Sequence, residues 1–96
     1  MIIAYATPPA CYASAAAYYA TQHDDGKVST KVYLDGSYAG VQWYSTHASG
    51  MGVFRHANGR WCLLGSSGGA YTVDQFVQLG VPRATATRLI AKLNHG

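Results

Sequence analysis

Cys11 and Cys62 carry the most distinctive chemistry in this sequence, and about half of the chain separates them. A disulfide between them would tie an early element to a late one. By the chain-entropy estimate it would stabilise the fold by about 4 kcal/mol in an oxidising compartment. The alternative is a pair of buried thiols that act as small apolar side chains. No pair of histidines accompanies the cysteines at the spacing of a zinc site, so we predict no metal and no cofactor.

A second hypothesis makes Cys11 a catalytic nucleophile. We expect it near the N-terminus of a helix, where the helix dipole lowers the pKa of a thiol, and His47 or His56 would be the base. This order of cysteine and histidine is similar to that of papain-like and transglutaminase-like enzymes. Asn58 is the only residue that could orient the histidine, and no carboxylate follows Trp61 in the strand. We therefore predict no catalytic residues, and keep a small papain-like cysteine hydrolase using Cys11 and His47 as an alternative.

The first element that would position these residues is an alanine-rich helix. Two prolines suit a first helical turn, and the alanines after them have high helix propensity. The pattern predicts a helix from Pro8 to Gln22, with Gly26 available to end it. Its alternating small and aromatic residues form a stripe that could pack against a sheet.

From Val28 to Gly65 the hydrophobic pattern changes to a period of two, which predicts strands. Asp35-Gly36 and Asn58-Gly59 are typical of tight hairpins. The links between strands are too short for the crossovers of a parallel sheet, so the sheet is predicted to be antiparallel. The four predicted strands are 28–34, 38–45, 50–56 and 60–65.

Two short helices are predicted to end the chain. Thr72 with Gln75 three residues later matches a capping box, Gly80 closes the first helix, and Pro82 suits the first turn of the second. We expect the pair to fold back over an edge of the sheet. The whole chain, 1–96, is thus predicted to be a single α+β domain, with an N-terminal helix on a four-stranded antiparallel meander and a C-terminal helical hairpin.

The charge pattern does not favour a nucleic-acid partner. The net charge is +3, but the lysines and arginines are scattered, whereas a phosphate footprint needs a clustered basic patch. The C-terminal helices resemble a helix-turn-helix, yet such domains need a third helix. Only Arg83, Arg88 and Lys92 could reach phosphates. No stretch has the roughly 18 to 20 apolar residues that cross a bilayer, so we predict no membrane span.

One face of the predicted sheet is aromatic and neutral. Charged residues make up 11% of the chain, against about 25% in a usual soluble domain. A face of this kind is typical of protein interfaces, and the alternative is that one of the predicted helical elements covers it. The residues we assign to this candidate binding face, opposite Val32, Val41 and Trp43, are Tyr33, Tyr38, Gln42, Tyr44 and Phe54.

The second half of the chain resembles small, uncharacterised bacterial exported proteins. The resemblance covers 35–93, and its most specific parts are Asn58-Gly59-Arg60-Trp61, Gly68-Gly69-Ala70 and Leu79-Gly80-Val81-Pro82. It implies a helix packed on an antiparallel sheet, like the cystatin-like group of folds, and a periplasmic or secreted location. It implies no active site. Met1 to Ala6 lacks the basic and apolar regions of a signal peptide, so we expect no intact export signal.

The function expected from these observations is non-enzymatic binding or inhibition of another protein in the bacterial envelope or exterior. The target and the oligomeric state are not specified by the sequence. Besides the cysteine hydrolase, an intracellular phage-type inhibitor is a further alternative. It would share the fold and keep Cys11 and Cys62 reduced.

Overall fold

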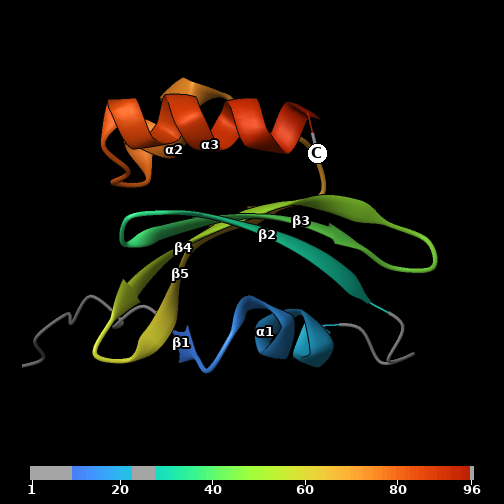
Figure 1. Cartoon of the computed structure of the whole chain (residues 1–96). Coiled ribbons are helices and arrows are strands. Elements are labelled where there is room, and N and C mark those ends of the chain that lie inside the picture. Colours follow the sequence, from blue (N-terminus) through green and yellow to red (C-terminus); the bar gives the residue numbers. More distant parts are fainter. Residues whose placement is uncertain (1–9, 23–27, 96) are drawn as a thin grey trace, which may run out of the picture.

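The computed structural model describes residues 10–22 and 28–95, which form a five-stranded antiparallel sheet between two helical layers. Figure 1 shows α1 on one face of the sheet and α2 with α3 on the other. The strand order is β1-β5-β4-β3-β2, so consecutive strands from β2 to β5 are neighbours and β1 adds to the far edge. The elements are β1 (Cys11–Tyr12), α1 (Ala15–Gln22), β2 (Ser29–Asp35), β3 (Tyr38–Tyr44), β4 (Ser49–Ala57), β5 (Arg60–Ser67), α2 (Val73–Gln78) and α3 (Arg83–His95).

The predicted α+β class and antiparallel meander are confirmed, with a correction at the N-terminus. The prediction of four strands and a helix starting at Pro8 is wrong, because Cys11 and Tyr12 pair with β5 as a fifth strand. The helix begins only at Ala15, where the Ser14 hydroxyl accepts a hydrogen bond from the Ala17 N–H at 3.0 Å. Pro8 and Gly26 lie outside the described residues.

Both predicted hairpins are confirmed by their backbone angles. Asn58 and Gly59 have φ of 53° and 76°, the left-handed pair that an Asn-Gly turn of type I′ requires. Gly36 has φ of 59° in the turn that joins β2 to β3. The four predicted strands match β2 to β5 apart from shifts at their ends.

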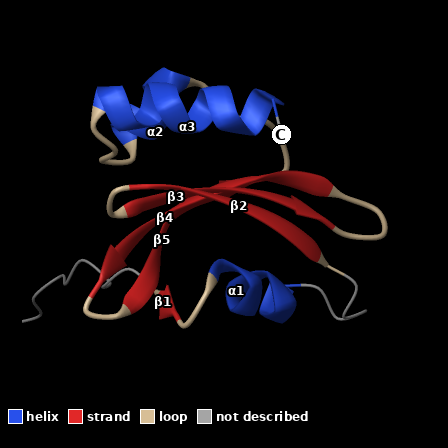
Figure 2. Cartoon of the chain, in the orientation of Figure 1, coloured by secondary structure: helices blue, strands red, loops and turns tan. Residues whose placement is uncertain are grey.

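The C-terminal helices form as predicted, but they cover a face of the sheet and not an edge (Figure 2). The capping box is present: the Gln75 N–H donates to the Thr72 hydroxyl at 3.2 Å, and the Thr72 N–H donates to Gln75 Oε1 at 2.9 Å. Gly80, at φ of 104°, lets the chain turn back into α3. The apolar stripe of α3 is buried against β2 and β3, which is why the helix lies across the face.

The sheet separates two apolar cores. The core under α2 and α3 is the larger, and Leu89 and Phe76 in it are fully buried. In the α1-side core, the Tyr19 ring stacks on Trp43 with centroids 5.6 Å apart and contacts Phe54 edge-on. The Tyr19 hydroxyl shares a hydrogen bond of 2.9 Å with Ser66 on β5. Tyr19 is therefore the main side chain that anchors α1 to the sheet.

Candidate functional site

The two cysteines form a disulfide, as the first hypothesis predicted. Cys11 and Cys62 lie directly opposite each other in the β1–β5 ladder, so the pairing of the strands brings their side chains together. The alternative of two separate buried thiols is wrong. Cys11 lies on a strand and not at a helix N-terminus, so the helix dipole invoked for a nucleophile does not act on it.

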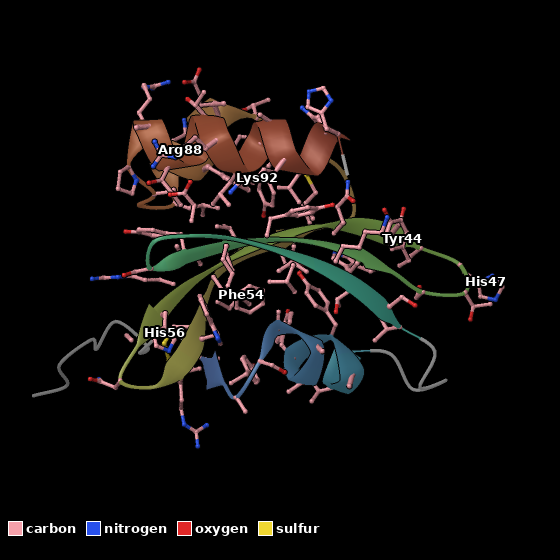
Figure 3. All side chains as sticks on the ribbon, viewed as in Figure 1. Tyr44, His47, Phe54, His56, Arg88 and Lys92 are labelled. Atoms are coloured by element: carbon pink, nitrogen blue, oxygen red, sulfur yellow. A yellow bond between two sulfur atoms is a disulfide. The ribbon has the colours of Figure 1, made fainter. Side chains whose placement is uncertain are left out.

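The histidines proposed as bases lie away from the Cys11 sulfur. Cys62 is opposite Arg55, which is opposite Tyr38, whereas His47 lies in the loop beyond Tyr44. The stretch from Tyr38 to Tyr44 alone spans roughly 20 Å, and Figure 3 shows His47 at the end of the sheet far from β1.

His56 lies closer to the disulfide than His47, but on the other face of the sheet. It pairs with Trp61, whose side chain points to the face opposite that of Cys62, and its ring packs on the Trp61 indole at 4.7 Å. The described residues thus bring no histidine to a reactive cysteine. Within 10–22 and 28–95 no three metal-ligating side chains cluster either.

Four of the five residues assigned to the candidate binding face share one face of the sheet, and helices cover it. Tyr33 and Tyr38 are half-buried against the core under α2 and α3. The Gln42 amide donates to the Leu93 carbonyl of α3 at 2.6 Å. Tyr44 is 41% exposed, and its hydroxyl donates to Gln42 Oε1 at 3.1 Å. Of these four side chains, Tyr44 is the exposed one.

The placement of Phe54 on the tyrosine face is wrong. Phe54 is opposite Ala39 in the β3–β4 ladder, and residues opposite each other share a face. Its ring therefore lies on the α1 side, fully buried against Tyr19 (Figure 3). The residue belongs to the core and offers no surface for binding.

The exposed apolar surface lies instead on the α1 face, at the β2 edge. Val32 is 46% exposed and Leu34 is 57% exposed. Between them and the start of α1 runs a groove of about 250 Å³, which continues past Ala39 to Trp61 on β5. Two of the lining residues have a polar side-chain group, namely Ser14 with its hydroxyl and Trp61 with its indole N–H.

This groove exists because α1 is too short to cover the sheet. Eight residues of helix span about 12 Å, whereas the seven residues of β2 span about 24 Å. The alternation of Val32 and Leu34 is typical of a strand with one buried side. The length of the helix on that side decides how much of it is covered, and α1 is shorter than the predicted helix.

A second, wider depression lies at the open end of the tyrosine face. It has a volume of about 620 Å³ and is lined by Tyr44, His47 and Ser49 with Gly68 from the loop after β5. The recess is shallow and open to solvent. Its lining includes no cysteine and no carboxylate that could orient His47, and its side-chain hydroxyls are those of Tyr44, Ser45 and Ser49.

The charged groups near the β2 edge lie on the opposite face from Val32 and Leu34. Arg88 of α3 binds both carboxylate oxygens of Asp35, at 2.6 and 2.9 Å, and these hydrogen bonds lower the pKa of Asp35. The Lys92 ammonium lowers it further, and it donates to the Leu34 carbonyl at 3.1 Å. Lys31 is exposed on this side. Among residues 10–22 and 28–95, three cations and one carboxylate therefore lie at this edge.

Comparisons of the chain with models of known protein families, with curated proteins and with solved structures give no match. The resemblance to small exported bacterial proteins thus stays a prediction. In the described part of the chain, none of the helices is long and apolar enough to span a bilayer.

Proposed function

We propose that this chain is a non-enzymatic, inhibitor-like module that binds another protein in the bacterial envelope or exterior. The observation that carries the proposal is the apolar groove between α1 and β2, with Val32 and Leu34 exposed beside it. Contiguous apolar surface on a soluble domain marks contact sites more often than isolated apolar residues do. The groove offers a partner an apolar lining with a half-buried Trp61 at one end.

The surroundings of the groove favour a rigid binding surface. Its floor is formed by side chains of β2, β3 and β5 in a five-stranded sheet, and its α1 wall follows β1, which the Cys11–Cys62 disulfide joins to β5. A surface that is already ordered loses less conformational entropy when a partner binds. Rigid elements also hold side chains more accurately than loops do. These features suit a module whose task is recognition.

The disulfide supports the proposed location. Disulfides form and persist in oxidising compartments such as the periplasm or the exterior, whereas cytoplasmic thiols are kept reduced. The alternative of an intracellular phage-type inhibitor requires both thiols to be free. The intact mass of protein isolated from its source cells under non-reducing conditions separates the two, because reduction of a disulfide adds two hydrogens.

A photo-crosslinking experiment tests the proposed binding surface. A benzoyl-phenylalanine side chain is placed at Leu34 in one variant and, as a matched control, at the exposed Ala84 of α3 in another. Both are irradiated in an extract of the source cells. We expect a discrete crosslinked partner from position 34 that excess wild-type chain competes away and a Val32→Asp chain does not. Identical products from both positions, or none from position 34, would contradict the proposal.

A further inference from the structure

The outer edge of β2 has backbone hydrogen-bonding groups that no strand within residues 10–22 and 28–95 pairs with. Asp35 and Tyr38 flank the two-residue turn between β2 and β3, so they form a hydrogen-bonded pair. In an antiparallel ladder, pairs that exchange backbone hydrogen bonds alternate with pairs that do not. Thr30, Val32 and Leu34 consequently direct their N–H and C=O groups away from β3. The contact of Lys92 with the Leu34 carbonyl agrees with this direction.

The two faces of this edge differ in chemistry. On the α1 side, Val32 and Leu34 stand beside the apolar groove. On the α3 side, the exposed Lys31 and Lys92 lie with the Arg88–Asp35 ion pair, so the side chains that the described residues place there are mostly basic. An added strand presents alternate side chains to the two faces. It would meet apolar surface at every second position and cations at the positions between.

We propose that β2 binds an extended segment of a partner protein in which apolar and acidic residues alternate, as an added strand of the sheet. The inference rests on the proposed function and specifies the form and charge of the partner. Backbone hydrogen bonds to Thr30, to Val32 and to the N–H of Leu34 would provide the pairing, while the Leu34 carbonyl accepts from Lys92. The apolar residues would pack on Val32 and Leu34, and the acidic residues would pair with Lys31 and Lys92.

A second copy of this chain fits the same edge less well. Self-pairing would bring the Lys31, Arg88 and Lys92 side chains of two copies together, and Asp35, the carboxylate that the described residues place at this edge, is already bound by Arg88. Like charges at such a contact are unfavourable. Lys92 thus protects the edge against other copies, in the way that lysines guard exposed edge strands. The same charge attracts an acidic strand.

The far edge of the sheet does not offer the same opportunity. β1 has two residues, against seven in β2, so an added strand would gain few backbone hydrogen bonds there. We therefore assign strand addition to the β2 edge alone among the described strands.

The test uses two fluorescein-labelled seven-residue peptides of alternating residues, one with glutamate and valine and one with lysine and valine. Fluorescence anisotropy is measured with the full chain at low salt, up to millimolar protein. We expect saturable binding of the glutamate peptide and at least tenfold weaker binding of the lysine peptide. In the Lys31→Glu, Lys92→Glu double variant the preference should reverse. Arg60→Glu, a charge reversal on the distant β4–β5 hairpin, is the control and should keep the wild-type preference.

A backbone variant separates strand addition from simple charge attraction. The Val32 N–H points away from β3, so Val32→Pro removes an edge donor and leaves the β2–β3 ladder intact. We expect at least a tenfold loss of glutamate-peptide affinity with near-wild-type thermal unfolding. If Val32→Pro unfolds, Val32 replaced by its N-methyl analogue in a synthetic chain gives the same measurement.

Four results would overturn the inference. They are no binding of the glutamate peptide, a preference that does not follow the charge reversal, full affinity in the backbone variant, or a β2-dependent dimer in sedimentation. If the peptides fail while position 34 still crosslinks to a partner, the proposed function stands and only the added strand is wrong.

Discussion

The two faces of the sheet are covered by different means. On the α3 face, a 13-residue helix buries Leu89 and Leu93 completely and is held by apolar packing. On the α1 face, an eight-residue helix leaves Val32 and Leu34 exposed and is held by a disulfide at its base and by Tyr19. Both layers bury apolar side chains, but the α1 layer covers less of its face and is also fixed by the disulfide. The second arrangement leaves apolar side chains of β2 exposed, where a partner could contact them.

Removing the disulfide should have the largest effect on the free energy of unfolding, because the disulfide links the α1 layer to the sheet. In the Cys11→Ala, Cys62→Ala double variant a covalent link across a sequence separation of 51 is lost. The chain-entropy estimate for that separation is about 4 kcal/mol of unfolding free energy. Urea unfolding measures it, and the wild-type chain with a reductant is the matched control. A loss below about 1 kcal/mol would show that α1 is held by packing alone.

Two leucines on opposite faces give the second test. Leu89→Ala leaves a cavity under α3, where the side chain is fully buried, and should cost about 3 kcal/mol. Leu34→Ala, at a side chain 57% exposed beside the groove, should change the free energy of unfolding by less than about 0.5 kcal/mol. Chemical unfolding of both variants gives the comparison. Equal costs would mean that the α1 face is packed as tightly as the other.

Gly52 tests the contact of Tyr19 with the sheet. A Cβ at Gly52 would overlap with the Tyr19 hydroxyl, and the Tyr19 side chain is 1% exposed, so it has no free space to move into. We expect Gly52→Ala to cost about 2 kcal/mol through overpacking. Gly68→Ala is the control, because its Cβ meets no atom within 4 Å. If both variants unfold like the wild type, α1 does not depend on Tyr19.

Local signals predicted the fold well, and signals that depend on distant residues did not. The Asn58-Gly59 turn and the Thr72–Gln75 capping box involve residues close in sequence, and both are present. The residues around Cys11 have high helix propensity, but Cys11 forms a strand because it pairs with Cys62. Cys62 is distant in the sequence, so local signals do not predict this pairing. Phe54 was misplaced because the loop between β3 and β4 leaves the register open, and a slip of one residue moves a side chain to the other face.

The candidate site was the least predictable part. The aromatic residues Tyr33 and Tyr38 have the composition of an interface, yet they are covered because α2 and α3 lie on their face. Val32 and Leu34 have the pattern of a core row, yet they are exposed because α1 spans half the length of β2. The helices that cover a face decide whether its side chains are exposed. The sequence of one strand does not contain that information.

The smallest expected effect is a pH dependence of the free energy of unfolding that comes from Tyr19. It tests how firmly the Tyr19 contact holds α1 on the sheet. Burial raises the pKa of Tyr19 to about 12, and the nearby phenols of Tyr18 and Tyr71 also raise it, against the lowering effect of the Ser66 hydrogen bond. The folded state therefore holds this proton more tightly than the unfolded state, whose value is 10.0. The stabilisation is complete below pH 10 and declines as the pH rises through 12.

Urea unfolding between about pH 9 and 11 should show a steeper loss of stability in the wild type than in Tyr19→Phe. Tyr44→Phe, at an exposed tyrosine, should keep the wild-type slope. Equal slopes in all three chains would mean that the Tyr19 hydroxyl reaches solvent and that α1 is held less firmly than its buried ring implies.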